Sequence, residues 1–424
     1  MKQNLSIMNR IAEAYVKLVL AVGHHDSDYV DAYYGPPEWK AQVDAEKPSL
    51  EVIKKRASAA LAELRTVAQA RLDEGARLRH TFLSKQLASM IARVTILTGS
   101  NLTFDDESRA LYDAAAPSHP ESHFEAILSE LGALLPGSGD VPERYERYKR
   151  GFVIPSAKLD AVFTAAIAES RNRTAEWIAL PEGENFSVEY VTGKSWSGYN
   201  WYKGNSQSLI QVNTDLPIHI DRAVDLASHE GYPGHHVYNA LLEQRLVREK
   251  QWWEFSVYAL FSPQSLIAEG TANFGIEMAF PAAERVAFER EVLFGLAGLS
   301  TEGTERYYQI HAIVQKLAYA GNEAARRYLN GAITRDDAAR WLTRYALMSP
   351  DRAQQRTRFF DQYRSYVINY NLGQDLVRRY VESRGGTPDK PSVRWKEFEE
   401  LLSTPRVPSA LLRPGNDLFA RPRF

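Results

Sequence analysis

Three histidines and a glutamate stand within eight residues near the middle of the chain. The segment ASHEGYPGHH covers residues 227–236 and contains His229, Glu230, His235 and His236. Imidazole nitrogens are frequent ligands of Zn²⁺, and a carboxylate next to the first histidine is suited to general-base chemistry. The chain of 424 residues has no cysteine, which excludes disulfides, thiol catalysis and thiolate ligands. The cluster therefore indicates a metal held by nitrogen and oxygen.

The spacing of these histidines does not fit an unbroken helix. The common signature His-Glu-x-x-His stacks two imidazoles one turn apart, but here the fourth residue after His229 is Pro233. In a regular helix His235 would lie about 120° around and about 9 Å along the axis from His229, and His236 about 10 Å along it. Because proline removes a helical hydrogen bond and glycine permits irregular backbone, we predict a kink at Pro233 and Gly234. It should turn His235 back toward His229, with His236 as the less favoured second ligand.

A third ligand is expected from the segment SPQSLIAEGTANFGIE, residues 262–277. Pro263 suits the first turn of a helix, which places Glu269 on the second turn. The small residues Gly270, Ala272 and Gly275 would let this helix press closely against the motif helix. Asn273 and Glu277 continue the same stripe and could orient the histidines. A single helical glutamate is usually solvated, but its pairing with the histidine motif predicts Glu269 as a metal ligand.

Most of the remaining sequence predicts helix. Apolar residues recur at helical spacing over residues 156–178, and similar patterns cover residues 50–70, 75–98, 120–134, 281–298, 303–330, 335–348 and 351–384. Residues 186–213 differ, because they are rich in Val, Tyr, Trp and Ser and are interrupted by glycines, which favours two or three short antiparallel strands. We expect a mainly α fold with a small antiparallel β patch just before the metal-binding helix.

Length and composition indicate an ordinary globular protein. The segment LLPGSGDVP (134–142) is the best candidate linker, so we expect an N-terminal helical region at 1–140 and a catalytic region at 141–424, or one continuous two-lobed domain. A net charge of −2 without a basic stripe argues against nucleic-acid binding. The sequence has no run of about 18 apolar residues, so we expect no membrane-spanning helix. The N-terminus is more typical of an amphipathic helix than of a signal peptide, so we expect a soluble cytoplasmic protein. The sequence does not indicate an oligomeric state.

The two motifs resemble those of a bacterial family known as domain of unknown function 885. Its signature is His-Glu-x-x-Pro-Gly-His-His followed by Glu-Gly-Trp-Ala-x-Tyr-x-Glu, and this chain has HEGYPGHH and EGTANFGIE. Thr271 stands in place of the tryptophan and Phe274 in place of the tyrosine. The family is similar to zinc metallopeptidases, so the resemblance implies a helical fold enclosing a deep cleft. It also implies Zn²⁺ as cofactor, with His229, His235 and Glu269 as ligands and Glu230 as general base.

The expected chemistry is hydrolysis. With three protein ligands a zinc ion keeps one position for water, and Glu230 would take a proton as that water attacks a carbonyl. The developing oxyanion needs a further donor. Tyr370 is the first choice, with Tyr366 and Arg364 behind it. Both tyrosines lie in YVINYNLG (366–373), which is similar to the family's tyrosine-rich C-terminal helix.

A peptide or a small amide is the expected substrate. A strand of the β patch beside the cleft could hold an extended peptide by backbone hydrogen bonds. Its aromatic residues could stack on the substrate, although strand aromatics more often pack within the protein; they are Trp196, Tyr199, Trp201 and Tyr202. The run YYGPP (33–37) favours a rigid turn over a cleft wall. The alternatives are an amidase or esterase on small non-peptide substrates, and a zinc-stabilised scaffold without turnover. The sequence does not distinguish endopeptidase from exopeptidase.

Overall fold

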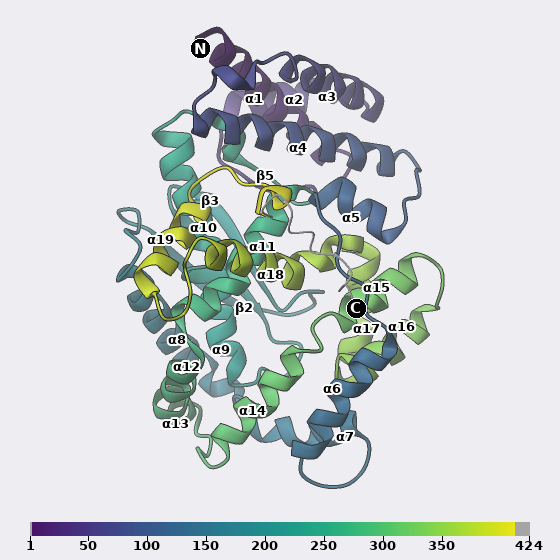
Figure 1. The fold of residues 1–424 in the computed structure, drawn as a ribbon, viewed down its shortest axis with the longest axis vertical. Helices are drawn as coiled ribbons and strands as arrows, with labels where there is room; N and C mark the ends of the chain where they lie inside the picture. Colours follow the sequence, from purple (N-terminus) through teal and green to yellow (C-terminus); the bar gives the residue numbers. More distant parts are fainter. Residues whose placement is uncertain (1, 412–424) are drawn as a thin grey trace.

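The computed structural model describes residues 2–411. Its N-terminal helices form a cap at one end of the molecule (top of Figure 1). Capping side chains fix where these helices begin: Asp73, for example, accepts a hydrogen bond from the amide of Ala76 at 2.8 Å. The helices of this region are α1 (Lys2–Gly23), α2 (Pro37–Glu46), α3 (Leu50–Leu64), α4 (Glu74–Leu97) and α5 (Phe104–Tyr112).

The predicted β patch is a three-stranded sheet with strand order β2-β4-β3. β3 (Gly198–Gly204) and β4 (Gln207–Asn213) are antiparallel, and the positive φ angles of Asn205 and Ser206 between them suit a two-residue hairpin. β2 (Asn185–Val191) lies parallel to β4, so only one of the two pairings is antiparallel. A second antiparallel pair joins β1 (Val30–Tyr33) to β5 (Val257–Ala259). β3 is an edge strand of its sheet.

The helices that carry the two sequence motifs lie in the middle of the molecule (Figure 1). The first motif spans α9 (Asp221–Leu226), the π-helical turn η4 (Ala227–Gly231) and α10 (His235–Leu242), which continues into η5 (Glu243–Arg248). The second motif lies in α11 (Pro263–Ala279), and α18 (Ile368–Ser383) packs alongside it. Side chains of both motifs and of α18 therefore meet in the middle of the molecule.

Two glycines fix the contact between α11 and α18. A Cβ atom added to Gly270 would lie 2.4 Å from the carbonyl carbon of Gly373, and one added to Gly373 would lie 2.6 Å from the carbonyl oxygen of Leu266. No side chain fits at either position, so the two backbones touch directly. Of the small residues that we expected to face the motif helix, Gly275 does so, with its missing Cβ 3.0 Å from Cγ of Pro233, whereas Gly270 faces α18 instead.

The other helices complete the two ends of the molecule. The larger hydrophobic core runs from the N-terminal cap to α18, and a smaller core lies around α8, α9 and α13. The helices that complete the two ends are α6 (Glu121–Leu134), α7 (Val141–Lys149), α8 (Leu159–Ala175), α12 (Ala282–Phe288), η7 (Glu289–Leu293), α13 (Phe294–Ala297), α14 (Thr304–Gln315), α15 (Ala320–Leu329), α16 (Arg335–Tyr345), α17 (Pro350–Tyr363) and α19 (Pro391–Leu402). Short helical turns are η1 (Gln69–Arg71), η2 (Arg150–Phe152), η3 (Ser156–Lys158), η6 (Trp253–Ser256), η8 (Arg364–Val367) and η9 (Pro408–Leu411).

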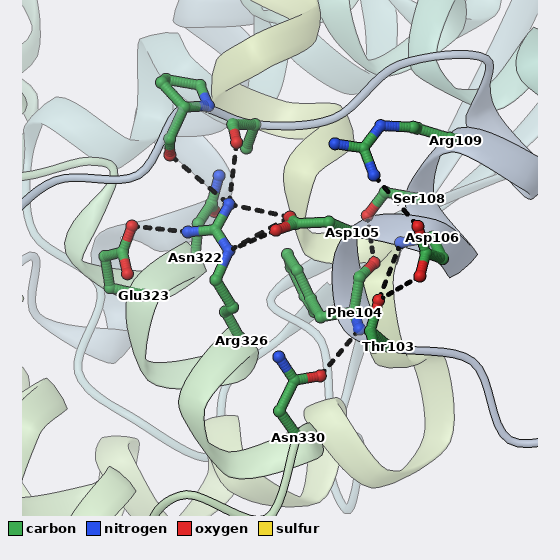
Figure 2. Close-up of polar contacts among 12 residues, drawn as sticks. Thr103, Phe104, Asp105, Asp106, Ser108, Arg109, Asn322, Glu323, Arg326 and Asn330 are labelled. Atoms are coloured by element: carbon green, nitrogen blue, oxygen red, sulfur yellow. Dashed lines mark hydrogen bonds and ion pairs between the residues drawn. The ribbon is translucent and has the colours of Figure 1, made fainter.

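A buried arginine ties the two halves of the chain together (Figure 2). Arg326 of α15 donates to Asp105 of α5 at 3.0 Å and to Glu323 at 2.5 Å. Nearby, the amide of Phe104 donates to Asn330 at 2.8 Å. These contacts anchor the start of α5 to α15 across more than two hundred residues of sequence.

The mainly α fold with a small β patch is confirmed. Within residues 2–411 no helix has both the length and the apolar character needed to cross a membrane. The division at residues 140/141 stays a prediction, and its last segment, 412–424, lies outside the described residues.

Candidate metal centre

The helix that carries the first motif is interrupted where the sequence predicts it. α9 widens into the π-helical turn η4, in which the amide of Tyr232 donates to the carbonyl of Ala227 at 3.1 Å. Residues 232–234 are not helical, and α10 begins at His235. A Cβ atom on Gly234 would lie 1.8 Å from the carbonyl oxygen of His229. Only glycine fits this close backbone approach, which returns His235 to the vicinity of His229.

The two imidazoles face each other across a short gap. The Nε2 atoms of His229 and His235 lie 3.2 Å apart, and the ring planes meet at 85°. From α11, Oε2 of Glu269 lies 3.2 Å from Nε2 of His229 and 3.6 Å from Nε2 of His235. The structure thus brings together the three residues that were predicted as ligands.

The size of this triangle fits a zinc ion. Zinc with bonds of about 2.0–2.1 Å in tetrahedral geometry holds its ligand atoms about 3.3–3.4 Å apart, close to the three distances here. Glu269 is only 6% exposed, and its Oε2 is buried without a hydrogen-bond donor. Burial alone would raise the pKa of Glu269, but the neighbouring His235 and His229 lower it well below its usual value. Among residues 2–411 no arginine or lysine forms an ion pair with this carboxylate, so a bound metal would supply the missing positive charge.

Hydrogen bonds from neighbouring helices orient two of the three side chains. Nδ1 of His229 lies 2.9 Å from Oδ1 of Asn273, whose amide nitrogen donates to the carbonyl of Tyr370 at 2.9 Å. Because Oδ1 is an acceptor, Nδ1 carries the proton and Nε2 presents its lone pair toward Glu269. On the other side, the Tyr366 hydroxyl donates to Oε1 of Glu269 at 2.8 Å. Such contacts set the orientation of ligands in metal sites.

Glu230 lies beside this triangle and is 4% exposed. Its carboxylate packs against Gly198 of β3, where a Cβ atom would lie 2.8 Å from Oε1, and the side chain of Asn200 donates to its backbone carbonyl at 2.7 Å. Burial raises the pKa of Glu230 to about 7. A carboxylate with such a pKa accepts and releases a proton readily at neutral pH.

The triangle and Glu230 open into one cavity of about 320 Å³. Its walls come from β1, β3, η4, α11, α17 and α18. Of the four aromatics proposed for stacking, Trp196 and Tyr199 line the cavity, whereas Trp201 and Tyr202 do not. The YYGPP run also lies outside the lining, and Tyr33 in it donates to the carbonyl of Pro36 at 2.5 Å, as in the rigid turn that we expected.

Asp31 of β1 is an acidic residue of the cavity that sequence reasoning missed. Burial raises its pKa to about 6, although a hydrogen bond from the Tyr199 hydroxyl opposes this shift. No local pattern in the sequence marks Asp31, because only the pairing of β1 with β5 brings it to the metal triangle.

Of the other residues predicted for the site, some line the cavity and others make contacts elsewhere. Tyr370 and Tyr366 line the cavity, but the Tyr366 hydroxyl is engaged by Glu269. Arg364 is not part of the lining and donates to Glu107 at 2.6 Å. Glu277, expected to support a histidine, instead accepts from Gln374 at 2.7 Å and contacts Arg378.

His236, the alternative second ligand, is directed away from the triangle. It is completely buried, with Nε2 3.0 Å from Glu184 and Nδ1 2.8 Å from the Ser208 hydroxyl. Both ring nitrogens are therefore engaged in the core, whereas Nε2 of His235 points at His229 and Glu269.

A second group with metal-like spacing contains Asp221, Asp225 and His311. Each carboxylate oxygen of this group already has a partner. Asp221 accepts from Tyr307 at 2.5 Å and lies 3.3 Å from His311, while Asp225 pairs with Arg285 at 2.8 Å and with Arg222 at 2.9 Å. The group is an internally neutralised network of hydrogen bonds and ion pairs.

Comparisons with known proteins establish the fold alone. No protein-family model matches the chain, and no curated protein matches it. A solved structure of a proposed lipoprotein from Colwellia psychrerythraea shares the fold, with 15% identity, a TM-score of 0.52, and coverage of 86% of this chain and 68% of the other. An M32 carboxypeptidase from Deinococcus radiodurans R1 is similar at 10% identity and a TM-score of 0.48, covering 95% and 90% of the two chains. The second likeness is too loose to support an argument, and none of these comparisons shows the resemblance to family 885.

Proposed function

We propose that this chain is a zinc-dependent hydrolase, and specifically a metallopeptidase that cleaves peptide bonds. The observation that carries the proposal is the triangle of His229, His235 and Glu269. Its three facing atoms are spaced as zinc requires, and a buried carboxylate oxygen there lacks any donor. A catalytic zinc site typically has three protein ligands of this kind and leaves one position open.

Zinc fits this set of donors better than Mg²⁺ or Ca²⁺ does. Two imidazole nitrogens and one carboxylate are a usual catalytic zinc set, whereas Mg²⁺ and Ca²⁺ prefer oxygen alone. When bound, zinc supplies Lewis acidity, which polarises a carbonyl group and makes water nucleophilic near neutral pH.

The chain's own residues would handle the protons and the developing charge. Glu230 is buried beside the triangle with a pKa of about 7, so its carboxylate can take a proton from water and pass it to the leaving nitrogen. Tyr370 lines the same cavity, and its hydroxyl has no hydrogen-bond partner among residues 2–411. It is therefore available to donate to an oxyanion, whereas Tyr366 already donates to Glu269.

The cavity wall favours a peptide substrate. β3 is an edge strand, and its residues Gly198, Tyr199 and Asn200 line the cavity. An edge strand can hold an extended peptide through backbone hydrogen bonds. The resemblance to family 885 supports the same function. The cytoplasmic location and the exclusion of nucleic-acid and membrane partners remain predictions.

Metal analysis combined with a peptide-library digest tests the proposal. Purified protein should contain close to one zinc per chain and should cleave a mixture of short peptides. Glu230→Gln should retain zinc and lose about 10²–10⁴-fold in rate, the usual contribution of a general base. The matched control is Glu182→Gln, which changes an exposed glutamate outside the cavity and should leave the rate unchanged.

The outcomes separate the alternatives. Equal cleavage by the wild type and by Glu230→Gln would remove the general base and with it the mechanism. Stoichiometric zinc without cleavage of any peptide, ester or amide would identify a zinc-stabilised scaffold. Cleavage confined to small esters or amides would identify the non-peptide hydrolase.

A further inference from the structure

One face of α17 presents arginines to the cavity. Arg352 and Arg356 lie one helical turn apart, and both line the cavity together with Phe359 and Tyr363 of the same helix. Arg358, two residues after Arg356, is exposed and does not line the cavity. Two positive charges are thus directed to the space that contains the metal triangle.

Neither of these guanidinium groups forms an ion pair among residues 2–411, although the charge of Glu269 partly opposes the lowering of the Arg356 pKa by burial. The hydrogen bond of Arg352 goes to a neutral hydroxyl, that of Ser197, at 3.2 Å. The guanidinium of Arg356 lies over the ring of Phe359 at 4.3 Å, and its Nε is buried without an acceptor. Burial and the like charges of Arg222 and Arg356 lower the pKa of Arg352 to about 10. Arg222, the third arginine of the cavity, is already neutralised by Asp225.

The two arginines lie close to the groups that would perform the hydrolysis. Arg352 contacts Ser197, which precedes the Gly198 that packs against Glu230. The guanidinium carbon of Arg356 lies 5.7 Å from the ring centre of Tyr370. A ligand group bound between the two arginines would therefore lie within a short distance of both the base and the oxyanion donor.

We propose that Arg352 and Arg356 bind the C-terminal carboxylate of the peptide substrate, which makes the protein a carboxypeptidase. This inference rests on the function proposed above. A planar guanidinium matches a carboxylate through paired N–H···O bonds, and a buried, unpaired guanidinium is costly unless a ligand neutralises it. The cavity, at about 320 Å³, is at the small end of the roughly 300–1,000 Å³ typical of ligand pockets.

The proposed reaction is hydrolysis of the last peptide bond. One water molecule is consumed: its oxygen bonds to the carbonyl carbon, the C–N bond breaks, and the leaving nitrogen takes a proton by way of Glu230. The products are a shortened peptide and one free amino acid, and no other reactant is needed.

Matched substrates test the carboxylate requirement directly. N-acetylated tripeptides ending in alanine, leucine, phenylalanine or lysine are offered to the zinc-loaded full chain as free acids and as C-terminal amides. A third set consists of amides that carry an internal glutamate. The free acids should be cleaved about 10- to 100-fold faster than either amide set, the range expected from a charged hydrogen-bonded contact.

Substitutions on α17 assign that preference to the arginines. Arg352→Gln and Arg356→Gln should each reduce kcat/KM on the acids by about 10- to 100-fold and leave the amides nearly unchanged. Arg358→Gln is the matched control on the same helix and should change neither rate. Thermal denaturation of each variant checks that the fold is intact.

A binding measurement without turnover separates this inference from the proposed function. In the Glu230→Gln protein, calorimetry should show that acids bind about 10- to 100-fold more tightly than amides and that Arg356→Gln removes the difference. The same arginine-dependent binding without cleavage by the wild type would refute the peptidase and leave the carboxylate subsite standing. Three results would overturn the inference. The first is equal cleavage and binding of acids and amides, and the second is a preference for the amides with an internal glutamate. The third is competition by inorganic phosphate but not by N-acetyl amino acids.

Discussion

Among residues 2–411, two groups of side chains have the spacing of a metal site, and their surroundings differ. His229, His235 and Glu269 form one group, and Asp221, Asp225 and His311 the other. In the second, all four carboxylate oxygens already pair with a hydroxyl, a histidine or an arginine. In the first, Oε2 of Glu269 is buried without a donor. Spacing alone therefore does not identify a metal site, and our proposal for the first group rests on its buried carboxylate oxygen without a donor.

The fixed cations explain this difference. Arg285 lies between η7 and α9, where it pairs with Asp225 and with Glu289 at 2.7 Å. Around Glu269 the structure instead provides one neutral donor, the hydroxyl of Tyr366. Neutral donors orient a carboxylate without cancelling its charge, so the first group keeps its attraction for a divalent ion.

Removing one carboxylate from each group should have opposite effects. Glu269→Gln should lower zinc affinity roughly 1,000-fold or more, since even loss of a ligand's hydrogen-bond partner costs about 10–100-fold. Asp225→Asn should leave zinc affinity unchanged and lower the free energy of unfolding by about 3 kcal/mol. Competition with a chromophoric chelator and urea denaturation measure the two quantities.

The comparison breaks down if both substitutions lower zinc affinity, which would make the second group a metal site as well.

Removing the buried cation of the second group should destabilise the fold. Arg285→Gln leaves Asp225 and Glu289 buried without their main partner, so the free energy of unfolding should fall by about 3 kcal/mol. The control Arg290→Gln breaks surface pairs with Glu291 and Glu305 and should leave stability unchanged within error. Urea denaturation in the presence of a chelator measures both.

If Arg285→Gln were as stable as the wild type, something other than this guanidinium would be neutralising the carboxylates.

Each of the two groups has one tyrosine whose hydroxyl donates to a carboxylate, so removing that hydroxyl tests the same difference between the groups. Tyr366→Phe removes the hydrogen bond to Glu269 and should lower zinc affinity by about 10–100-fold. Tyr307→Phe removes the equivalent hydrogen bond to Asp221 in the second group. It should cost about 1 kcal/mol of stability and leave zinc affinity unchanged. Similar zinc affinities for the two variants would show that the Tyr366 hydroxyl has no effect on the metal.

The local sequence was sufficient to predict much of the site. Pro233 and Gly234 indicated an interrupted helix because the histidine spacing fits no regular one, and the interruption lies there. Most predicted helices are present within a few residues. Two predicted helices, 303–330 and 351–384, continue through breaks that the periodicity did not show. These breaks lie at residues 316–319 and at η8, where Arg364 adopts a positive φ of 50°.

The residues that were missed depend on contacts between distant parts of the chain. Asp31 reaches the cavity because β1 pairs with β5, more than two hundred residues away. Arg352 and Arg356 look like ordinary surface arginines of a helix until α17 is placed against β3 and α18. The parallel pairing of β2 with β4 also escapes a local reading, because the β3–β4 hairpin puts β4 in the middle of the sheet.

The direct backbone contact of Gly270 with Gly373 has a consequence for biosynthesis. During translation, Glu269, the last of the three candidate ligands, is added about one hundred residues before Gly373. Until then Glu269 lacks the Tyr366 hydroxyl, and Asn273 lacks the carbonyl of Tyr370 that holds its amide. The incomplete polypeptide has the ligands but not their supports, so the centre matures only near the end of translation.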